Sequence, residues 1–221
     1  MYKNIKIIAV SDMHGNLNFD VPYCDILLIA GDICPSERVS VLSCGMQADW
    51  FYGVFTPWLE KQPCMDCVAV AGNHDWVFQD ALGDLEMPEK FSYLCEDSVT
   101  IGGVKIYGTP YQPMFCNWAF NVGSIELHRR FQQIPMDTNI LLTHTPPLYI
   151  MDLTDSMDSI GSDSLRVKVD SMKNLLHVFG HNHGMHGVQR VGKNRYVNAS
   201  LLNEQYQMVN KPIVINYRVE V

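Results

Sequence analysis

Histidine, aspartate and asparagine recur in this sequence in short groups whose side chains are typical metal ligands. The stretch VFGHNHGMHG, residues 178–187, carries His181, His183 and His186 among three glycines. Imidazole is the commonest metal ligand in proteins and also titrates near neutral pH. Alternating histidines point to one side only on an extended backbone, and glycine allows a sharp turn beside a ligand. Taken alone, the stretch fits half of a metal site and equally fits a solvated loop.

Five short apolar runs rich in Ile, Val and Leu have the composition of buried strands. They cover residues 5–10, 25–30, 67–71, 139–143 and 175–180, and none alternates cleanly between apolar and polar residues. Continuous apolar strands are buried on both faces, as in the middle of a layered α/β domain. In open α/β sheets, ligands bind at the carboxyl ends of the strands. The residues that follow these runs are therefore the ones expected to form a site.

Each of the five runs is followed by a group that can bind a metal. The groups are SDMHG, GDI, GNHD, HTPP and GHNH, in chain order. The candidate ligands in them are Asp12, His14, Asp32, Asn73, His144, His181 and His183. One such group arises easily by chance, whereas five in a row at strand ends indicate a joint metal site. Oxygen and imidazole ligands without thiolate suit Mn, Fe, Zn, Co or Ni.

The series D-x-H, G-D, G-N-H-D, H and G-H-x-H resembles the calcineurin-like metallophosphoesterase superfamily over residues 12–183. The stretches GTPYQPMFCNWAFN, THTPPLYIMD, HVFGHNH and YVNAS are similar to its MPPED-type group, which is itself similar to class III cyclic nucleotide phosphodiesterases. The resemblance implies two divalent metal ions. The first would be held by Asp12, His14 and His183, the second by Asn73, His144 and His181, and Asp32 would bridge them.

The resemblance also implies a reaction. Two such ions clamp a phosphate and activate a bridging water, and the resulting hydroxide attacks phosphorus in line. His74 would lie beside the leaving oxygen, where it stabilises charge or donates a proton; a structural role is the alternative. Asp75 is a second catalytic candidate because it is adjacent to His74, although successive side chains usually diverge.

One motif departs from the protein serine/threonine phosphatases of this superfamily. Their G-D-x-x-D-R block supplies an acid that orients the catalytic histidine and an arginine that grips phosphate. Here the block is GDICPSER, so Pro35 replaces the acid and Arg38 comes three residues late. The departure disfavours a protein phosphatase and leaves open which residue orients His74.

The segment QPMFCNWAFN, residues 112–121, is the candidate substrate loop. An aromatic ring beside a dimetal site can stack on a nucleobase. The alternative is that Trp118 and Phe120 only anchor the loop to the core. The candidate substrate-binding residues are Asn73, His74, Phe115, Asn117 and Trp118.

These features predict a dinuclear-metal phosphoesterase that hydrolyses a small phosphodiester, with a cyclic nucleotide among the candidates. A phosphomonoesterase would use the same site. A weakly catalytic nucleotide-binding or scaffold protein is the third alternative, but such a protein would have eroded ligands, and all seven positions carry competent side chains.

The mix of strand and helix patterns predicts one α/β domain with two packed sheets and helices outside. The resemblance implies that residues 1–221 form a single calcineurin-like metallophosphoesterase domain, a four-layer α/β/β/α sandwich with two packed mixed sheets. Residues 98–108 form two β-rich runs around Gly102 and Gly103, which is a hairpin signal. Further strands are expected near the C-terminus. Helical patterns cover residues 46–61 with a break or kink at Pro57, residues 123–134 with Ser124 as N-cap, and about residues 162–173.

Composition limits the partners and the compartment. The 221 residues carry a net charge of −8, which argues against polymeric nucleic acid and against an anionic membrane. A small phosphoester or nucleotide substrate is the expected partner, and a homodimer is the expected assembly. No long apolar run or export signal is visible, and seven scattered cysteines are typical of reduced thiols. We therefore expect a cytoplasmic protein.

Overall fold

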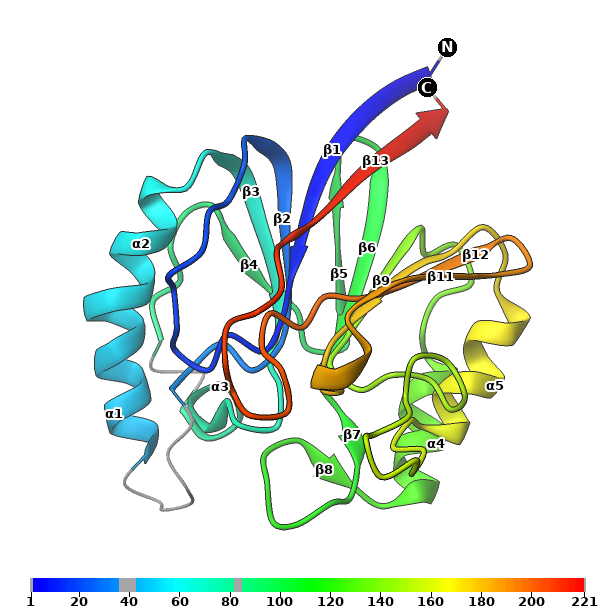
Figure 1. Cartoon of the computed structure of the whole chain (residues 1–221). Helices are drawn as coiled ribbons and strands as arrows, with labels where there is room; N and C mark the ends of the chain where they lie inside the picture. The colour runs from blue at the N-terminus through cyan, green and yellow to red at the C-terminus, as the bar shows by residue number, and fades with distance from the viewer. Residues whose placement is uncertain (1, 36–42, 82–84, 221) are drawn as a thin grey trace.

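Two mixed β-sheets pack face to face at the centre of the molecule (Figure 1). The computed structural model describes residues 2–35, 43–81 and 85–220. The first sheet contains, in spatial order, β13 (Ile213–Glu220), β1 (Tyr2–Val10), β2 (Cys24–Ala30), β3 (Cys64–Val70) and β4 (Phe91–Tyr93). The second contains β11 (Gly187–Val191), β12 (Asn194–Asn198), β10 (Leu176–Phe179), β9 (Ile140–Thr143), β6 (Val104–Thr109) and β5 (Asp97–Ile101).

The interior strands of both sheets are parallel, and antiparallel strands lie at the edges. In the first sheet β1, β2, β3 and β4 are parallel neighbours, and β13 is antiparallel to β1. In the second, β12, β10, β9 and β6 are parallel, and β11 and β5 pair antiparallel to their neighbours. All five apolar runs form buried strands, as predicted, and these strands pair in parallel with their neighbours. β5 and β6 form the predicted hairpin.

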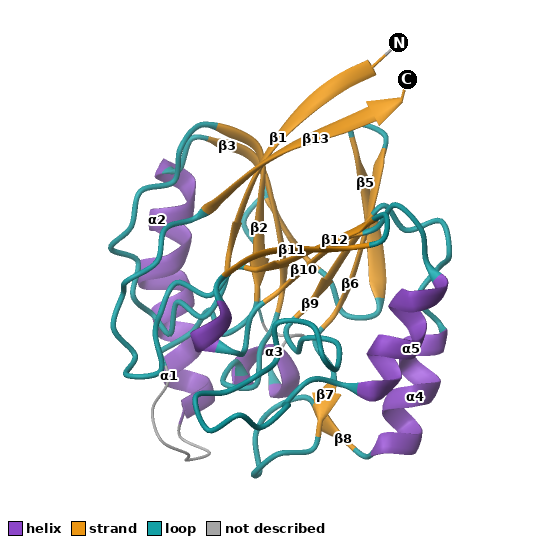
Figure 2. Cartoon of the chain, turned by 45° about the vertical axis from the view of Figure 1, so that its right-hand side comes forward, coloured by secondary structure: helices purple, strands orange, loops and turns teal. Residues whose placement is uncertain are grey.

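Helices cover the outer face of each sheet (Figure 2). The first sheet is covered by α1 (Ser43–Trp50), the π-helical η1 (Phe51–Phe55), α2 (Thr56–Lys61) and α3 (Trp76–Asp80). The second is covered by α4 (Ser124–Gln132) and α5 (Asp163–Ser171). The remaining short elements are β7 (Gln112–Pro113), β8 (Asn121–Val122) and the 3-10 turn η3 (His183–Met185). The predicted α/β/β/α sandwich is confirmed.

Three apolar layers explain why the strand sequences do not alternate. In β2, Leu27 and Ile29 pack against the helices of the first sheet, whereas Ile26 and Leu28 pack against the second sheet. All four side chains are fully buried. Complete burial of one such side chain contributes about 1.5–3 kcal/mol, so an apolar residue at every position stabilises both interfaces.

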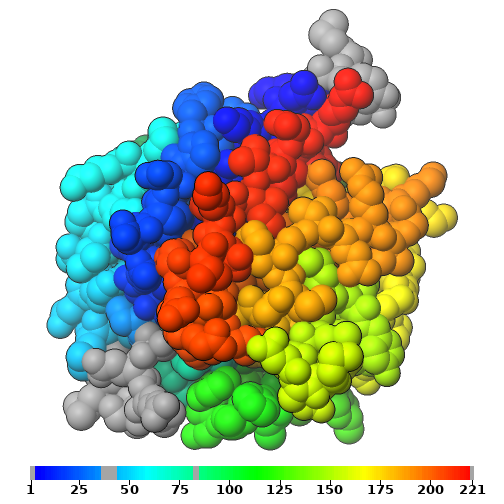
Figure 3. Space-filling view, in the orientation of Figure 1, coloured from blue at the N-terminus to red at the C-terminus, as the bar shows by residue number. Residues whose placement is uncertain are grey.

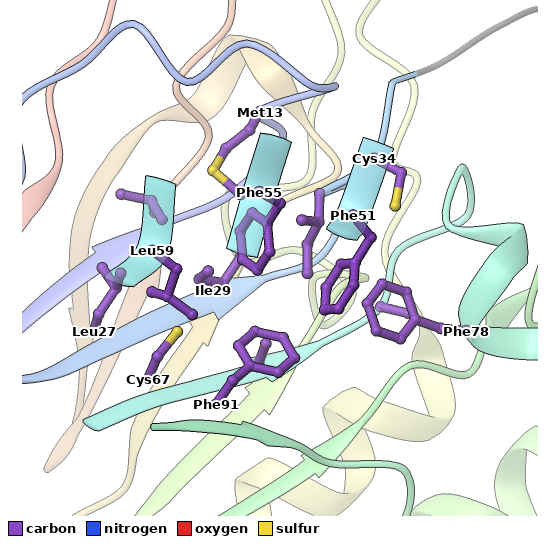
Figure 4. Packing of buried hydrophobic residues seen from close by; sticks show 14 of the residues in the cluster. Met13, Leu27, Ile29, Cys34, Phe51, Phe55, Leu59, Cys67, Phe78 and Phe91 are labelled. Atoms are coloured by element: carbon purple, nitrogen blue, oxygen red, sulfur yellow. The ribbon is translucent and has the colours of Figure 1, made fainter. Parts of the chain in front are cut away.

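The helical segment from Ser43 to Lys61 continues through Pro57 without a break. The chain changes to a π-helix at Phe51–Phe55, and Pro57 then falls in the first turn of α2, where a missing N–H costs little. Phe51 and Phe55 stack with ring centroids 5.1 Å apart and face β2 and β3 (Figure 4). Pro57 therefore changes the helix type and does not end the helix.

The N-terminal caps of α5 and α4 differ in how well the sequence pattern predicts them. The Ser162 hydroxyl accepts a hydrogen bond from the Leu165 N–H and caps α5. The prediction of Ser124 as N-cap is wrong, because α4 begins at Ser124 and Gly123 takes the cap position with extended backbone and no side-chain bond.

None of the helices in the described part of the chain combines the length and apolar character needed to cross a membrane.

Candidate metal centre and active site

The predicted ligands lie at the carboxyl ends of neighbouring strands from both sheets. Asp12, Asp32 and Asn73 follow β1, β2 and β3, which are adjacent and parallel in the first sheet. His144 and His181 follow β9 and β10, which are adjacent and parallel in the second. Parallel strands end at the same edge of a sheet, so these five side chains meet at the seam between the two sheets.

One group of side chains is formed by Asp12, His14 and His183, each with a ligand atom within 4.8 Å of the others. His183 Nδ1 lies 3.1 Å from the Asn203 carbonyl oxygen, and with its proton there His183 Nε2 faces Asp12 Oδ1 at 3.4 Å. Both ring nitrogens of His14 are buried without a hydrogen-bond partner among the described residues. Buried polar atoms of this kind are rare unless another ligand satisfies them.

A second group surrounds His144. Its Nδ1 lies 2.8 Å from the Ala30 carbonyl oxygen, and its Nε2 lies 3.0 Å from Asn73 Oδ1 and 3.4 Å from Asp32 Oδ2. The ring of His181 packs edge-on against that of His144, with centroids 5.0 Å apart. A proton on Nδ1 of His144 would leave Nε2 free to bind a metal, an arrangement typical of metal-ligating histidines.

Asp32 stands between the two groups. Its Oδ2 lies 3.5 Å from His14 Nε2 and 3.4 Å from His144 Nε2. Its Oδ1 accepts a 2.8 Å hydrogen bond from the His74 backbone N–H. One carboxylate oxygen therefore faces both groups, as a bridging ligand would.

Two buried carboxylates dominate the electrostatics of the site. Asp12 and Asp32 are 0% and 2% exposed, and all ion pairs that they make within the described residues are with histidines. Burial opposes ionisation of Asp12, but the neighbouring imidazoles of His183 and His144 lower its pKa to about 2. Burial likewise opposes protonation of His144, yet the charges of Asp32 and Asp12 raise its pKa to about 9. The pair of anions thus requires nearby positive charge.

His14 and His181 are neutral at physiological pH. Burial lowers the pKa of His14 to about 4 and that of His181 to about 3. Neutral imidazoles keep a lone pair for a metal. Uncompensated carboxylates, neutral histidines and the unpartnered nitrogens of His14 together fit divalent cations of the borderline transition-metal type.

Four of the seven candidate ligands have left-handed backbone, which non-glycine residues rarely adopt. The φ angles are 54° at Asp12, 44° at His14, 51° at Asp32 and 68° at His181. Each such residue costs of order 1–3 kcal/mol and persists where the surrounding structure imposes it, often at functional sites.

The glycines of the G-N and G-H motifs allow the strand ends to approach each other. A Cβ atom at Gly72 would overlap the side chain and backbone of Asp32, and one at Gly180 would overlap Ser11 Oγ and Asp12 Oδ2. Side chains at these positions would displace the two carboxylates, so the motif needs glycine for packing.

His74 is fixed at both ends of its backbone. Its N–H donates to Asp32, and its carbonyl accepts a 2.7 Å bond from Gln47 Nε2. Its ring packs 4.7 Å from that of Trp118 and 5.0 Å from that of His14. Asp32, Gln47, Trp118 and His14 thus position His74. No local pattern points to Gln47, because it lies on a helix remote from the motifs.

Asp75 lies beneath the site and holds two loops together. Its Oδ1 accepts a hydrogen bond from the Cys34 N–H at 2.8 Å, and its Oδ2 accepts from Ile33 at 3.1 Å and Gly72 at 2.8 Å. Burial and the Asp32 charge raise its pKa to about 7 against these three donors. Backbone N–H groups bind both oxygens, which is the geometry of a positioning residue, and a catalytic role for Asp75 stays a prediction.

The aromatic loop divides its side chains between the core and the site. Phe120 is 3% exposed and anchors the loop, and the Ala119 N–H donates to the Asn73 carbonyl oxygen at 3.0 Å. Trp118 is half-buried beside His74, and Phe115 packs 5.4 Å from it while 60% exposed. Asn117 is exposed. Anchoring thus belongs to Phe120, and Trp118 lies at the site.

The departure from the protein phosphatases has a structural counterpart. The Pro35 carbonyl accepts a 3.3 Å bond from Gln47 Nε2, and Pro35 itself packs where a side chain at Gly15 would go. Arg38 lies outside the described residues. Gln47 therefore links the segment that carries Pro35 to the His74 backbone.

Sequence reasoning missed Tyr206 and Asn203, which contact the first group. The Tyr206 ring lies 4.9 Å from that of His14 and 5.1 Å from that of His183. Their segment, NEQYQ, is polar and follows no strand motif, so neither periodicity nor spacing could identify it.

Known proteins with similar sequences carry the same type of domain. The chain is 33% identical to human Metallophosphoesterase domain-containing protein 1 over 96% of its own length and 70% of the human protein. It is 30% identical to UPF0046 protein K07C11.7 of Caenorhabditis elegans, over 95% of this chain and 74% of that protein. A solved crystal structure with 15% identity has the same fold, with a TM-score of 0.68 over 97% of this chain and 99% of the other. Residues 5–185 match the calcineurin-like phosphoesterase family model, and the chain belongs to this family.

Proposed function

We propose that this protein is a dinuclear-metal phosphodiesterase that hydrolyses a small phosphodiester, with a cyclic nucleotide among the candidate substrates. The observation that carries the proposal is the position of Asp32 Oδ2, which lies 3.5 Å from His14 Nε2 and 3.4 Å from His144 Nε2. A single oxygen that faces imidazoles of two ligand groups is the arrangement a two-ion site requires.

The residues that would hold the ions follow from the two groups. The first ion would be held by Asp12, His14 and His183, the second by Asn73, His144 and His181, with Asp32 shared. Bound there, divalent ions such as Mn, Fe, Zn, Co or Ni would attract the phosphate oxygens and lower the pKa of a water molecule. The Ala30 and Asn203 carbonyl oxygens support this role, because each can hold the Nδ1 proton of a histidine and leave its Nε2 free.

His74 is the proposed proton donor to the leaving oxygen. Its ring lies within reach of both His14 and Asp32, at the border of the ion groups and the aromatic loop. The bond that its N–H donates to Asp32 and the bond that its carbonyl accepts from Gln47 fix its backbone, and the rings of Trp118 and His14 pack against its imidazole. Loss of a positioned acid of this type lowers the rate about 100- to 10,000-fold.

Trp118 is the proposed contact for an organic group on the phosphate. It is half-buried next to His74, and Phe115 and Asn117 lie exposed on the same loop. A flat aromatic face suits a nucleobase. The net charge of −8 supports a small ligand over a polymeric nucleic acid.

A phosphomonoesterase is the second candidate, because the same ion site would bind a terminal phosphate. The experiment uses metal-stripped protein with Mn²⁺, Ni²⁺, Co²⁺ or Zn²⁺ added back, and compares bis-p-nitrophenyl phosphate with p-nitrophenyl phosphate. We expect metal-dependent hydrolysis of the diester that Asn73→Ala and His74→Ala both abolish. His128→Ala is the matched control, since His128 is exposed on α4. Faster hydrolysis of the monoester would favour the phosphomonoesterase. No turnover with any metal would contradict both activities and leave a binding or scaffold role.

The proposed base contact has its own test. Trp118→Ala should raise KM for a cyclic nucleotide about 5- to 150-fold, which corresponds to about 1–3 kcal/mol for one stacked base, and should change KM for bis-p-nitrophenyl phosphate much less. Equal changes for both substrates would refute the stacking role.

A further inference from the structure

The segment from Leu202 to Met208 forms a tight turn, the 202–208 hairpin, over the first ligand group. Leu202 and Met208 pair as an antiparallel bridge, and the Asn203 N–H donates to the Gln207 carbonyl oxygen at 3.0 Å. Asn203 Oδ1 also accepts hydrogen bonds from the N–H groups of Gln205 and Gln207. In Figure 3 this orange-red segment occupies the middle of the visible face, between the blue N-terminal region and the yellow-green loop. The asparagine thus builds a turn that carries Tyr206.

Two residues of the hairpin reach candidate ligands. The Asn203 carbonyl oxygen lies 3.1 Å from His183 Nδ1. The Tyr206 ring packs against two imidazoles, 4.9 Å and 55° from that of His14 and 5.1 Å and 72° from that of His183. Tilted and edge-on contacts at this distance are attractive and orient both rings.

His14 differs from His183 and His144 in what holds its ring. Metal-ligating histidines usually donate their second N–H to a carbonyl or carboxylate, which fixes the ring. His183 and His144 each have a carbonyl oxygen for this purpose, whereas neither nitrogen of His14 has a hydrogen-bond partner among residues 2–35, 43–81 and 85–220. Its Nε2 lies 3.5 Å from Asp32 Oδ2 without forming a hydrogen bond, so ring packing has to supplement this contact in orienting His14. The Tyr206 ring lies 4.9 Å from it, about as near as that of His74 at 5.0 Å and nearer than that of His183 at 5.4 Å.

The backbone of Tyr206 supports a functional reading of this contact. Its φ is 59°, which is uncommon for an aromatic residue and carries strain. Its side chain is 51% exposed, so burial in the core does not account for its position. The turn built by Asn203 holds the phenol ring over the site at a cost in backbone energy.

We propose that Tyr206 is a positioning residue that orients His14 and His183 for the first ion by ring packing. The inference rests on the proposed function, because it assumes the two-ion centre. It assigns the role to the ring and not to the hydroxyl. Tyr206→Phe should therefore behave as the natural protein, and Tyr206→Leu, which keeps apolar volume without a ring, should not.

The test is calorimetric titration of metal-stripped protein with Mn²⁺, together with the visible absorption of the Co²⁺-loaded form. The natural protein should bind two equivalents. Tyr206→Leu should bind one of the two about 10- to 100-fold more weakly and should change the Co²⁺ spectrum, which reports ligand geometry. Tyr149→Ala is the matched control, because Tyr149 is also an exposed aromatic residue with left-handed φ. Tyr206→Ala carries the same expectation if circular dichroism shows that the leucine variant is unfolded.

The His183→Ala variant shows which of the two ions Tyr206→Leu weakens, because His183→Ala alone should abolish binding of the first ion. In that background Tyr206→Leu should leave the affinity for the remaining ion unchanged. A weaker remaining ion, or a Tyr206→Phe variant as impaired as Tyr206→Leu, would overturn the ring-packing role. If Tyr206→Leu bound two equivalents of Mn²⁺ with unchanged affinity, the ring-packing role would be overturned and the proposed metal centre would be supported. A natural protein that binds no Mn²⁺ or Co²⁺ would remove the metal centre and this inference together.

Discussion

His177 on β10 makes the stability of this protein sensitive to acid. It is fully buried between Phe179 and Tyr196, and its Nε2 lies 2.8 Å from the Thr143 hydroxyl. That hydroxyl donates to the Thr145 carbonyl oxygen, so His177 Nε2 donates to Thr143, and Nδ1 has no hydrogen-bond partner among the described residues that would accept a second proton. Burial lowers the pKa of His177 to about 3 from an unfolded value of 6.5.

The direction of the pH dependence follows from the linkage between protonation and folding. A depressed folded pKa means that the unfolded chain takes up the proton first, so the stabilisation is complete above pH 6.5 and is lost as the pH falls towards 3. Between pH 7 and pH 5 the unfolded histidine becomes protonated and the folded one does not. This difference lowers the free energy of unfolding by about 2 kcal/mol. With an m-value of about 2 kcal/mol per M, the urea midpoint falls by about 1 M.

The assay is urea unfolding of metal-stripped protein at pH 7 and pH 5, for the natural sequence and for His177→Gln. Glutamine keeps a donor for Thr143 but does not titrate, so the variant should lose about 2 kcal/mol less between the two pH values. Other buried histidines contribute equally to both proteins and cancel in the comparison. His128→Gln, an exposed change on α4, should behave as the natural protein. The same pH dependence in His177→Gln and in the natural protein would refute the reasoning.

Three further perturbations test the supports of the site. Gly180→Ala should lower Tm and weaken Mn²⁺ binding, because its Cβ would overlap Asp12 and such overpacking costs about 1–3 kcal/mol. Gly184→Ala is the control and should change neither quantity, because its Cβ would meet only side-chain ends. Equal behaviour of the two variants would contradict the packing argument. Asp75→Asn should lower the free energy of unfolding by about 3 kcal/mol in urea titrations, since three buried N–H donors lose a charged acceptor; an unchanged midpoint would show that they do not depend on it. Gln47→Ala should lower kcat for the diester about 10-fold with KM nearly constant, and a change in KM alone would argue against a positioning role.

The strand framework, and the meeting of the candidate ligands at one end of it, could be predicted because both follow from local patterns in the chain. Each apolar run ends in a motif, and β1, β2, β3, β9 and β10 all lie where those runs predicted. Residues that contact the site from distant parts of the chain carry no such local signal. Gln47 reaches His74 from α1, and Tyr206 reaches His14 from a polar turn, so only the three-dimensional arrangement reveals them.

The cap at Ser124 failed for a related reason. Serine is a good cap in isolation, but the extended backbone of Gly123 places the start of α4 one residue earlier, and no local pattern distinguishes the two positions. Asp75 illustrates the same limit at the site. Its adjacency to His74 in sequence implied shared chemistry, whereas its carboxylate points into the backbone of two loops.

The left-handed backbone at Asp12, His14, Asp32 and His181 also bears on how this chain evolves. Glycine or asparagine would relieve the strain at each position, so mutations that abolish the ligand set are there the ones that most stabilise the fold. A lineage released from selection for the chemistry should lose these four residues early and gain thermal stability as it does so. The strain at these four positions is thus a cost in stability that a functional metal centre would explain.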